Sequence, residues 1–287
     1  MLDGALALAL PVRFGQQLTV TEQPHLSGHH WVSFDHQGRP WFEGCFSPTG
    51  AYVSGNEEKT GNRLENLFQA IERQRPDFWL GRLPLRFETQ LTFPRQWGLG
   101  SSSTLVAALA AWAEVDAFQL LADTFGGSGY DVACAHAHQP ILYQRRDGRG
   151  HYVECPYAPP FADNICFVYL GKKQDSREGI ARYRESVKDS PRLIEGISRL
   201  TMDFLAARTV KEGVEILEAH ERLVGDALQL PKVKERYFYN FPGAVKSLGA
   251  WGGDFVMALS DKPAEATRQY FRVKGFETVF TWREMAL

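Results

Sequence analysis

Hydrophobic and polar positions follow two different periods in the first half of the chain. Residues 15 to 53 are rich in Thr, Val and aromatic residues and are interrupted by Gly and Pro, which predicts short antiparallel strands. Residues 86 to 93 alternate between apolar and polar and predict a strand that ends at Pro94. Between residues 61 and 73 the spacing is helical and predicts an amphipathic helix, with Thr60 as its candidate cap. The apolar face of that helix consists of Leu64, Leu67, Phe68 and Ile71.

A longer apolar run extends from about residue 102 to 125. It is hydrophobic on all sides, which predicts one long buried helix. Towards the C-terminus, strands are predicted at 165–170, 255–259 and 277–282, and a helix at 263–273. Two amphipathic helices are predicted between the first two of these strands. Their apolar faces consist of Leu193, Ile197, Leu200, Phe204 and Leu205 in the first, and of Ile216, Leu217, Leu223, Val224 and Leu228 in the second.

Three prolines interrupt residues 152–161, and this stretch is the candidate domain boundary. We therefore expect an N-terminal α/β domain at residues 1–160 and a C-terminal domain at residues 161–287. Strands and helices alternate in the second part, which suggests a small ferredoxin-like domain. The predicted fold class is α+β with two domains.

Composition narrows the class of protein. The chain has 287 residues, a formal net charge of −2 and 44% hydrophobic residues, which is ordinary for a globular protein. A nucleic-acid or membrane-surface protein would show a basic run or face, and the sequence has none. No apolar run approaches the ~18–20 residues that cross a bilayer. The four cysteines form no C-x-x-C pair, so we expect reduced thiols and a cytoplasmic location.

The first candidate for chemistry is the sequence Gly-Leu-Gly-Ser-Ser-Ser at residues 98–103, between a predicted strand and a predicted helix. Glycines allow close backbone approach, and a helix N-terminus offers free N–H groups and a partial positive charge to a phosphate. Serine hydroxyls can donate to phosphate oxygens or bind Mg²⁺. The segment is neither a Walker A loop nor G-x-G-x-x-G, because Ser103 occupies the last glycine position. The alternative is a helix capped by serine after a turn.

A second glycine-rich segment, residues 127–131, ends in Asp131. A single Asp after a glycine turn is most often a helix cap. The functional alternative is a carboxylate that accepts or orients the proton of an attacking hydroxyl.

Two further segments hold weaker candidates. Residues 246–254 form a glycine-rich turn before a strand, and such turns often serve only tight backbone packing. Cys134, His136 and His138 are close in sequence, but a zinc site needs about four ligands. On a helix His136 would also diverge from the other two, so a zinc site is disfavoured.

Taken in this order, the three glycine segments resemble the signature of the GHMP kinases, the family of galactokinase, homoserine kinase, mevalonate kinase and phosphomevalonate kinase. The central family motif, P-x-x-x-G-L-G-S-S-A, is matched at residues 94–103 except at Ser103. Residues 127–133 are similar to the G-S-G-[FY]-D-V-A form of phosphomevalonate kinases, and the whole chain resembles a GHMP subgroup named for its G-Y-D-I-A segment. The third segment resembles K-x-[ST]-G-A-G-G-G-G, and its matching residues are Lys246, Gly249, Ala250, Gly252 and Gly253.

This resemblance implies the GHMP kinase fold, with a ribosomal-protein-like N-terminal α/β domain and a ferredoxin-like C-terminal domain. It implies that Asp131 is the catalytic carboxylate, with Ser128 and the loop 249–253 shaping the acceptor side. It also implies ATP and Mg²⁺ as cofactors, with the Ser102 hydroxyl on phosphate or on the metal ion. The residues implied to wrap the ATP phosphates are Gly98, Leu99, Gly100, Ser101, Ser102 and Ser103.

The chain departs from the family pattern at three places. Trp251 and Asp254 interrupt the third motif, and Asp254 either marks an uncommon substrate or points away from the phosphates. Leu120 occupies the position, eleven residues before Asp131, at which mevalonate kinases carry a Mg²⁺-binding Glu, so the acidic metal ligand is unassigned. Residues 1–8 resemble only the end of the first family motif, without its strand, Lys and Glu. We therefore expect a longer reading frame upstream of Met1, and a truly short chain would be a weak or inactive kinase.

The predicted function is transfer of the γ-phosphoryl group of ATP to a hydroxyl or phosphate of a small metabolite. Mevalonate or phosphomevalonate is the favoured acceptor, because the segment around Asp131 is most similar to those kinases. The alternatives are a sugar kinase of the same superfamily, an ATP-dependent diphosphomevalonate decarboxylase, and a non-catalytic ATP- or metabolite-binding protein. The expected partners are ATP and a small-molecule acceptor, with neither nucleic acid nor a membrane, in a monomer or a homodimer.

Overall fold

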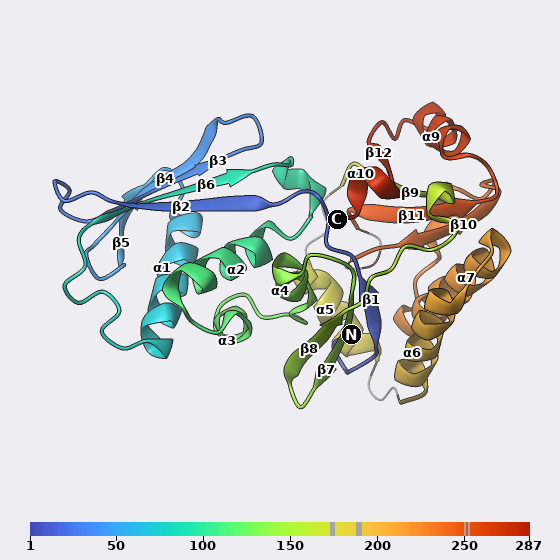
Figure 1. Cartoon of the computed structure of the whole chain (residues 1–287), viewed down its shortest axis with the longest axis horizontal. Coiled ribbons are helices and arrows are strands. Elements are labelled where there is room, and N and C mark those ends of the chain that lie inside the picture. Colours follow the sequence, from blue (N-terminus) through green and yellow to red (C-terminus); the bar gives the residue numbers. More distant parts are fainter. Residues whose placement is uncertain (173–175, 188–190, 250, 252) are drawn as a thin grey trace. The chain divides into compact units, whose positions relative to one another are not determined.

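The computed structural model describes residues 1–287 except 173–175, 188–190, 250 and 252 (Figure 1). Contacts between Cα atoms divide the chain into two compact units that are interleaved in sequence.

One of these, which we call the central unit, consists of residues 14–95 and 99–136. The other, the terminal unit, consists of residues 1–13, 96–98 and 137–287. The chain therefore passes between the units within the first glycine segment, at residues 98 and 99.

The central unit contains a five-stranded sheet with the order β2-β6-β3-β4-β5. Only β3 and β6 pair in parallel, and the other neighbours are antiparallel. Along the seven residues of β6, buried and half-buried side chains alternate, as the sequence pattern of this strand predicts. The strands are β2 (Gln16–Glu22), β3 (His29–Phe34), β4 (Pro40–Phe46), β5 (Tyr52–Gly55) and β6 (Leu85–Leu91).

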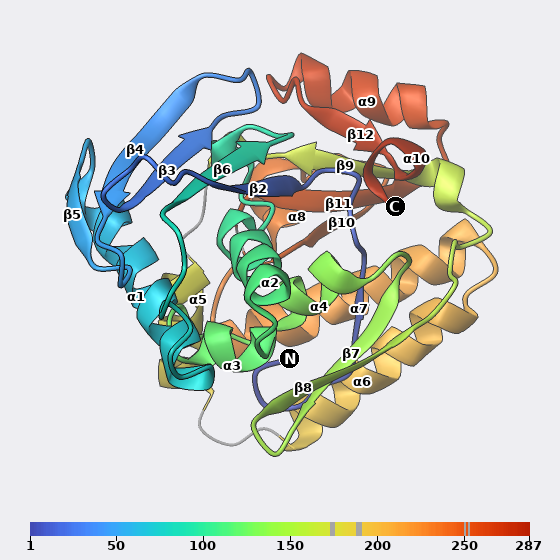
Figure 2. The same cartoon turned by 60° about the vertical axis from the view of Figure 1, so that its left-hand side comes forward.

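Helices cover one face of this sheet (Figure 2). Helix α1 (Glu58–Gln74) confirms the predicted amphipathic helix and buries the four predicted apolar residues, but its N-cap is Glu57 and not Thr60. The core between sheet and helices is rich in aromatic residues. Trp31 stacks on Phe87 with ring centroids 5.0 Å apart, and Phe68 lies 5.3 Å from the Phe87 ring. Burial of each such ring contributes roughly 1.5–3 kcal/mol, so this cluster holds the helices on the sheet.

The prediction of one long helix between residues 102 and 125 is wrong. Helix α2 (Ser101–Ala113) ends at Glu114, which has a left-handed φ of 57°, and α3 (Ala117–Ala122) begins after a turn. Asp116 caps α3 by accepting hydrogen bonds from two backbone N–H groups at 2.8 and 3.0 Å. A continuously apolar run indicates burial but does not show where a buried helix turns, whereas Asp116 is a cap signal.

The terminal unit contains a four-stranded antiparallel sheet with the order β10-β11-β9-β12. Its strands are β9 (Ile165–Tyr169), β10 (Gly243–Ser247), β11 (Phe255–Ser260) and β12 (Val279–Thr281). Three of these strands, β9, β11 and β12, were predicted; β12 is shorter than expected because Trp282 already begins a helix. Residues from β9, β10, β11 and β12 form one hydrophobic cluster with Phe271 of helix α9 (Ala264–Val273).

A second, three-stranded sheet of the terminal unit has the order β1-β7-β8. Here β1 (Ala7–Ala9) pairs with β7 (Ile141–Arg146), and β7 forms a hairpin with β8 (Arg149–Glu154). These strands precede the candidate boundary at residue 160, yet they group with the C-terminal residues by contact. A division into domains at residue 160 stays a prediction.

Two of the remaining helices, α6 (Pro191–Ala206) and α7 (Val210–Leu228), confirm the predicted amphipathic pair. Helix α5 (Ser176–Ser186) was not predicted, because its residues are largely polar and charged. The short elements of this unit are α8 (Val233–Tyr237), α10 (Trp282–Met285) and a 3₁₀ turn at Ala162–Asn164.

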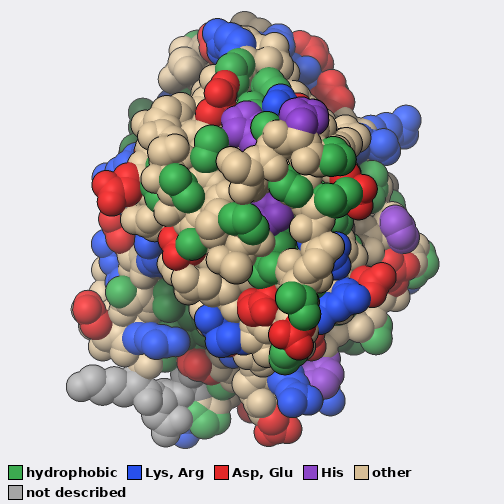
Figure 3. Space-filling model, turned by 90° about the vertical axis from the view of Figure 1, so that its left-hand side faces the viewer, with side chains coloured by type: hydrophobic (Ala, Val, Ile, Leu, Met, Phe, Trp, Pro, Cys, Tyr) green, Lys and Arg blue, Asp and Glu red, His purple; other side chains and the backbone are tan. Residues whose placement is uncertain are grey.

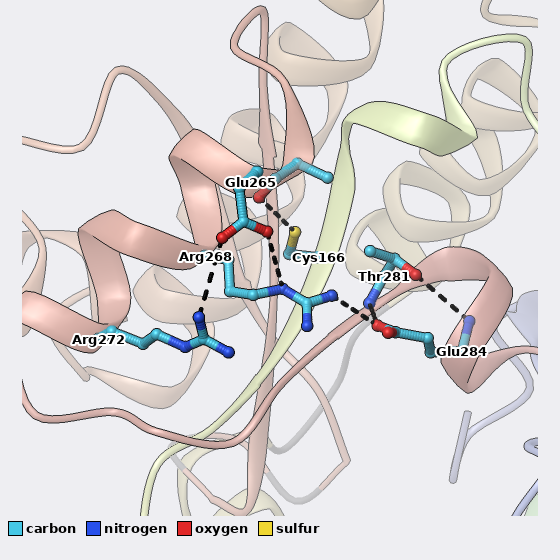
Figure 4. Close-up of polar contacts among 7 residues, drawn as sticks. Cys166, Glu265, Arg268, Arg272, Thr281 and Glu284 are labelled. Atoms are coloured by element: carbon cyan, nitrogen blue, oxygen red, sulfur yellow. Dashed lines mark hydrogen bonds and ion pairs between the residues drawn. The ribbon is translucent and has the colours of Figure 1, made fainter.

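Polar contacts join α9 to α10 at the C-terminus (Figure 4). Arg268 of α9 lies 2.7 Å from the carboxylate of Glu284 and 3.7 Å from that of Glu265. Thr281 and Glu284 form a capping box at the start of α10. The side chain of Arg268 is only 18% exposed, so its paired carboxylates offset part of the cost of burying a charge.

The surface shows no single concentration of charge on the face drawn in Figure 3, where Lys and Arg side chains are interspersed with Asp and Glu. Within the described ranges, no helix is both long enough and apolar enough to cross a bilayer.

Helix α7 begins with a capping box that gives a first testable prediction. The Thr209 hydroxyl accepts from the Glu212 amide at 3.2 Å, and the Glu212 carboxylate accepts from the Thr209 amide at 3.0 Å. Thr209→Ala is expected to lower the free energy of unfolding by about 1 kcal/mol, measured by urea denaturation. Lys211→Ala is the control, because Lys211 is exposed in the same turn and its ion pair at 4.0 Å is worth little. Equal effects of the two substitutions would contradict the capping role.

Candidate functional site

The first glycine segment leads into the N-terminus of α2. Gly98 and Gly100 have left-handed φ values of 68° and 73°, which glycine adopts without steric cost. Gly100 is the N-cap of α2 and, as a glycine, has no side chain that could cap the helix. The amides of the first turn therefore have no intrahelical acceptor and point out of the helix end, where the helix dipole also favours an anion.

Three serines occupy that first turn. Ser102 is exposed, whereas Ser101 and Ser103 are half-buried. Thr104, next in the helix, is already engaged, since its hydroxyl donates to Gln16 at 3.0 Å. The turn therefore combines backbone N–H donors with serine hydroxyls, a set of groups suited to phosphate oxygens.

The structure brings Asp131 to this helix end. Asp131 lies in the first turn of α4 (Tyr130–His136), which packs against α2 within the central unit. A Cβ atom added to Gly100 would lie 3.7 Å from both Cγ and Oδ1 of Asp131, so the half-buried carboxyl group is beside the residue that begins α2. Gly100 and Asp131, thirty-one residues apart in the sequence, are thus neighbours in space.

Ser128 precedes α4 and is half-buried between two glycines, Gly127 and Gly129, with positive φ values of 106° and 87°. This turn directs the chain into α4 immediately before Asp131. A role for Ser128 on the acceptor side stays a prediction.

Gly98 lies against Asp254 in the terminal unit. A Cβ atom added to Gly98 would be 2.1 Å from the Asp254 Cγ and 2.3 Å from each carboxylate oxygen. Asp254 thus points towards the first glycine segment and not away from it. Burial, together with the negative charge of Asp254, raises the pKa of Tyr169.

Aromatic residues attach the start of the same segment to the terminal unit. The 3₁₀ turn Arg95–Trp97 precedes Gly98, and Trp97 packs on Phe280 with ring centroids 5.2 Å apart. The Tyr169 hydroxyl donates to the Gln96 carbonyl at 2.8 Å. These contacts fix the chain immediately before Gly98.

The third glycine segment follows β10. Lys246 is partly buried and its Nζ donates to the Ser247 carbonyl at 2.8 Å. Burial lowers the pKa of Lys246, and the negative charge of Glu221 partly opposes that shift. Gly249 is exposed, has a φ of 63° and has open space where a side chain would be, and Gly253 is buried. Two predicted residues, Ala250 and Gly252, lie outside the described residues.

The residues around α2 fit a magnesium ion. Mg²⁺ typically takes one or two carboxylates together with phosphate oxygens and water, and the exposed Ser102 hydroxyl at this helix end is an oxygen group of the kind that it binds. Leu120, at the position of the expected acidic ligand, is fully buried in the core of α3. No group of three or more potential metal-binding His, Cys, Asp or Glu side chains occurs among the described residues.

Cys134, one of the three residues of the disfavoured zinc site, is half-buried in α4. Burial, reinforced by the nearby charge of Asp131, raises the pKa of Cys134 to about 12.

Sequence reasoning missed Glu221 of α7, a carboxylate that is only 1% exposed. It accepts a hydrogen bond from the Ser247 amide at 2.9 Å and one from the Trp251 indole N–H at 3.1 Å. The sequence does contain a signal for this residue, because Glu221 lies at helical spacing from Leu217 and Leu228. All three residues are buried in the structure. A carboxylate on the apolar face of a helix requires a polar partner.

No protein-family model matches the chain, and no curated protein sequence matches it. Solved structures do match in fold. The mevalonate kinase of Methanococcus jannaschii has a TM-score of 0.66 and 11% identity, over 99% of this chain and 92% of that one.

Two further solved structures are similar to this chain over most of their length. The Streptococcus pneumoniae phosphomevalonate kinase, in complex with phosphomevalonate and AMPPNP, has a TM-score of 0.67 and 14% identity, over 97% of this chain and 94% of that one. The Lactococcus lactis galactokinase, complexed with galactose, has a TM-score of 0.66 and 12% identity, over 97% of this chain and 88% of that one. These neighbours are GHMP kinases, and they confirm the predicted α+β, two-domain GHMP kinase fold.

Proposed function

We propose that this chain, which has the GHMP kinase fold, is an ATP-dependent kinase that phosphorylates a small metabolite. The observation that carries the proposal is the position of Asp131 beside Gly100, the glycine at which α2 begins. A phosphate-binding helix end and a carboxylate next to it are the two elements that phosphoryl transfer to a hydroxyl needs.

In the proposed reaction the first-turn amides and the Ser102 hydroxyl bind the phosphates of ATP and hold the γ-phosphorus in place. Asp131 accepts the proton of the acceptor hydroxyl while that oxygen forms a bond to the γ-phosphorus and the bond to the β-phosphate oxygen breaks. Bound Mg²⁺ supplies neutralisation of the charge on the phosphates. Positioning and charge neutralisation provide most of the catalysis in reactions of this type.

For the acceptor we propose mevalonate or phosphomevalonate. The sequence around Asp131 resembles the corresponding segment of those kinases, and two of the structural neighbours carry those names. A sugar kinase is the second candidate, and the neighbouring galactokinase supports it. The cytoplasmic location stays a prediction. A homodimer stays a prediction.

The test is ATP consumption by the protein with Mg²⁺ and a panel of acceptors. The panel contains mevalonate, phosphomevalonate, diphosphomevalonate, homoserine and common sugars, and CO₂ release is followed in parallel to detect a decarboxylase. Turnover that depends on one acceptor would support the kinase and identify its substrate. Binding of ATP without turnover on any acceptor would contradict the proposal and favour a binding protein.

Ser102→Ala is expected to weaken binding of Mg²⁺-ATP by about 10- to 100-fold, the effect of losing a hydrogen bond to a charged group. The measurement is titration calorimetry with a non-hydrolysable ATP analogue. Ser103→Ala is a matched control, because the GHMP motif has alanine at this position, so that only the backbone amide of Ser103, which the substitution retains, is implied in phosphate binding. The affinity of this variant should stay within a few-fold of the wild type. Equal losses in both variants would contradict a specific role for Ser102.

A further inference from the structure

The four-stranded sheet of the terminal unit carries aromatic side chains on the face that α9 does not cover. Side chains alternate along a strand, so the residues of β9, β11 and β12 that pack with α9 alternate with residues of the other face. Three aromatic residues belong to this second set, namely Tyr169 of β9, Phe255 of β11 and Phe280 of β12. Tyr169 and Phe255 are direct partners in the ladder with ring centroids 5.4 Å apart, and the Phe280 ring lies 6.4 Å from that of Phe255. We call these three residues the aromatic surface.

Trp97, the residue before the first glycine segment, packs on the aromatic surface. Its ring centroid lies 5.2 Å from that of Phe280, 6.2 Å from that of Phe255 and 6.3 Å from that of Tyr169. Residues 96–98 group by contact with the terminal unit, whereas the chain immediately before and after them groups with the central unit. The terminal unit therefore holds this part of the chain through a stretch of only three residues.

A hydrogen bond from Tyr169 adds a fixed direction to this packing. The hydroxyl donates to the Gln96 carbonyl at 2.8 Å. Burial, together with the charge of Asp254, raises the pKa of Tyr169 and so favours the protonated form that can donate. Ring packing tolerates rotation and sliding, whereas a hydrogen bond to a carbonyl oxygen restrains the orientation of one peptide group. Tyr169 therefore restrains the path of the backbone into Trp97 and Gly98.

Gly98, the next residue, lies against the same end of the sheet. The Leu170 amide donates to the Asp254 carbonyl at 2.8 Å, which extends the pairing of β9 with β11 beyond the two strands and restrains the backbone of Asp254. A Cβ atom added to Gly98 would lie 2.1 Å from the Asp254 Cγ. Residues 96, 97 and 98 thus each contact this sheet, through a hydrogen bond, ring packing and close approach respectively.

We propose that Tyr169 and Trp97 are positioning residues for the nucleotide, because they hold Gly98 at the start of the segment that binds the ATP phosphates. This inference rests on the proposed kinase function. Glycine loses more conformational freedom on ordering than any other residue, so a detached Gly98 would rarely adopt its left-handed φ of 68°. The attached state offers an ordered Gly98 to the phosphates, and the apparent dissociation constant rises as the attached fraction falls. The effect should fall on the nucleotide and not on the acceptor, whose proposed contact is Asp131.

The first experiment measures trypsin cleavage of the bond between Arg95 and Gln96, identified by mass spectrometry, and requires neither nucleotide nor turnover. Both side chains are exposed, but the backbone of residues 96–98 must leave the sheet before it can enter the protease. Tyr169→Phe keeps the ring and removes the donor. It should accelerate this cleavage about three- to tenfold, the effect of one hydrogen bond on the detached fraction.

Tyr157→Phe is the matched control for this substitution. The Tyr157 hydroxyl also donates to a backbone carbonyl in the terminal unit, that of Phe204 at 2.9 Å. The control therefore removes the same kind of hydrogen bond without removing one from residues 96–98. Cleavage after Arg95 should stay at the wild-type rate in this variant.

The second experiment measures binding of a non-hydrolysable ATP analogue with Mg²⁺ by titration calorimetry. Tyr169→Phe should weaken binding about three- to tenfold, and Trp97→Leu, which loses the ring contacts, should act in the same direction, whereas Tyr157→Phe should bind like the wild type. Saturating analogue should also slow cleavage of Tyr169→Phe towards the wild-type rate, because a ligand that binds the attached state stabilises it. With the acceptor that supports turnover, the KM of ATP should rise by the same factor and the KM of the acceptor should not change.

The results distinguish a failure of this inference from a failure of the proposed function. A wild-type cleavage rate in Tyr169→Phe would overturn the attachment. Faster cleavage with unchanged nucleotide affinity, or an equal loss of affinity in Tyr157→Phe, would overturn the positioning role and leave Tyr169 a structural residue alone. If the wild-type protein binds no ATP analogue, the proposed kinase function fails and the positioning role fails with it, while faster cleavage would still establish the attachment of residues 96–98.

Discussion

Asp131→Asn is expected to lower turnover by about 10²- to 10⁴-fold, the range by which a positioned general base contributes to catalysis. Asparagine has nearly the same shape as aspartate, so the fold around Gly100 and α4 should be retained. The amide cannot accept a proton from the acceptor hydroxyl, however, and it removes the charge beside the helix end. The measurement is kcat with the best acceptor of the panel, together with the affinity for a non-hydrolysable ATP analogue, which should change much less than kcat.

Asp123→Asn is the matched control for this substitution. Asp123 is exposed at the end of α3, eight residues before Asp131, and it accepts from the Gln119 side chain at 2.8 Å. It has no place in the proposed reaction, so its turnover should stay within about twofold of the wild type. Retention of most activity in Asp131→Asn would rule out a proton-accepting carboxylate and would leave the helix end as a binding site alone.

Most elements of the fold could be predicted from the sequence because each has a clear period. Helices α1, α6 and α7 are amphipathic, and β6 alternates, so their spacing indicates both their type and their buried face. The break between α2 and α3 could not be predicted from hydrophobicity. A segment that is apolar on every side shows no hydrophobic periodicity, so nothing in its pattern marks where a helix ends. Helix α5 was missed for the opposite reason, since it has few apolar residues.

The candidate site could be predicted in part. The local chemistry of residues 98–103 and 127–131 is visible in the sequence, since glycines, serines and an aspartate suit phosphate binding and proton transfer. Their proximity is not visible, because it depends on the packing of α4 against α2. The contact between Glu221 and Trp251 was missed for the same reason: a buried polar pair thirty residues apart leaves only a weak signal in each helix or loop.

The departures from the GHMP motifs have structural explanations that are specific to this chain. Leu120, at the position of the expected acidic ligand, is part of the hydrophobic core and supports α3. Trp251 packs where Gly225 leaves room. Asp254 occupies the space in which a side chain of Gly98 would lie. Two of these departures, Trp251 and Asp254, thus lie against a glycine of the same unit.

The pairing of Gly98 with Asp254 leads to the prediction with the largest expected effect on stability. Gly98→Ala places a Cβ atom 2.1 Å from the Asp254 Cγ, so the carboxylate must move away and lose its contacts. The left-handed φ of 68° adds about 1–2 kcal/mol for a non-glycine residue, and the overpacking about 1–3 kcal/mol more. We therefore expect the free energy of unfolding to fall by about 2–5 kcal/mol, measured by urea denaturation.

Two comparisons separate the steric cost from the backbone cost. Gly100 has nearly the same φ, 73°, but a Cβ atom there would meet Asp131 only at 3.7 Å, an ordinary contact. Gly100→Ala should therefore lose only the backbone part, about 1–2 kcal/mol. In an Asp254→Ala background the carboxylate is absent, so Gly98→Ala should cost no more than Gly100→Ala does in the wild type. If Gly98→Ala instead costs the same with and without Asp254, the carboxylate does not lie against the glycine segment, and the close approach that requires glycine at this position must have another cause.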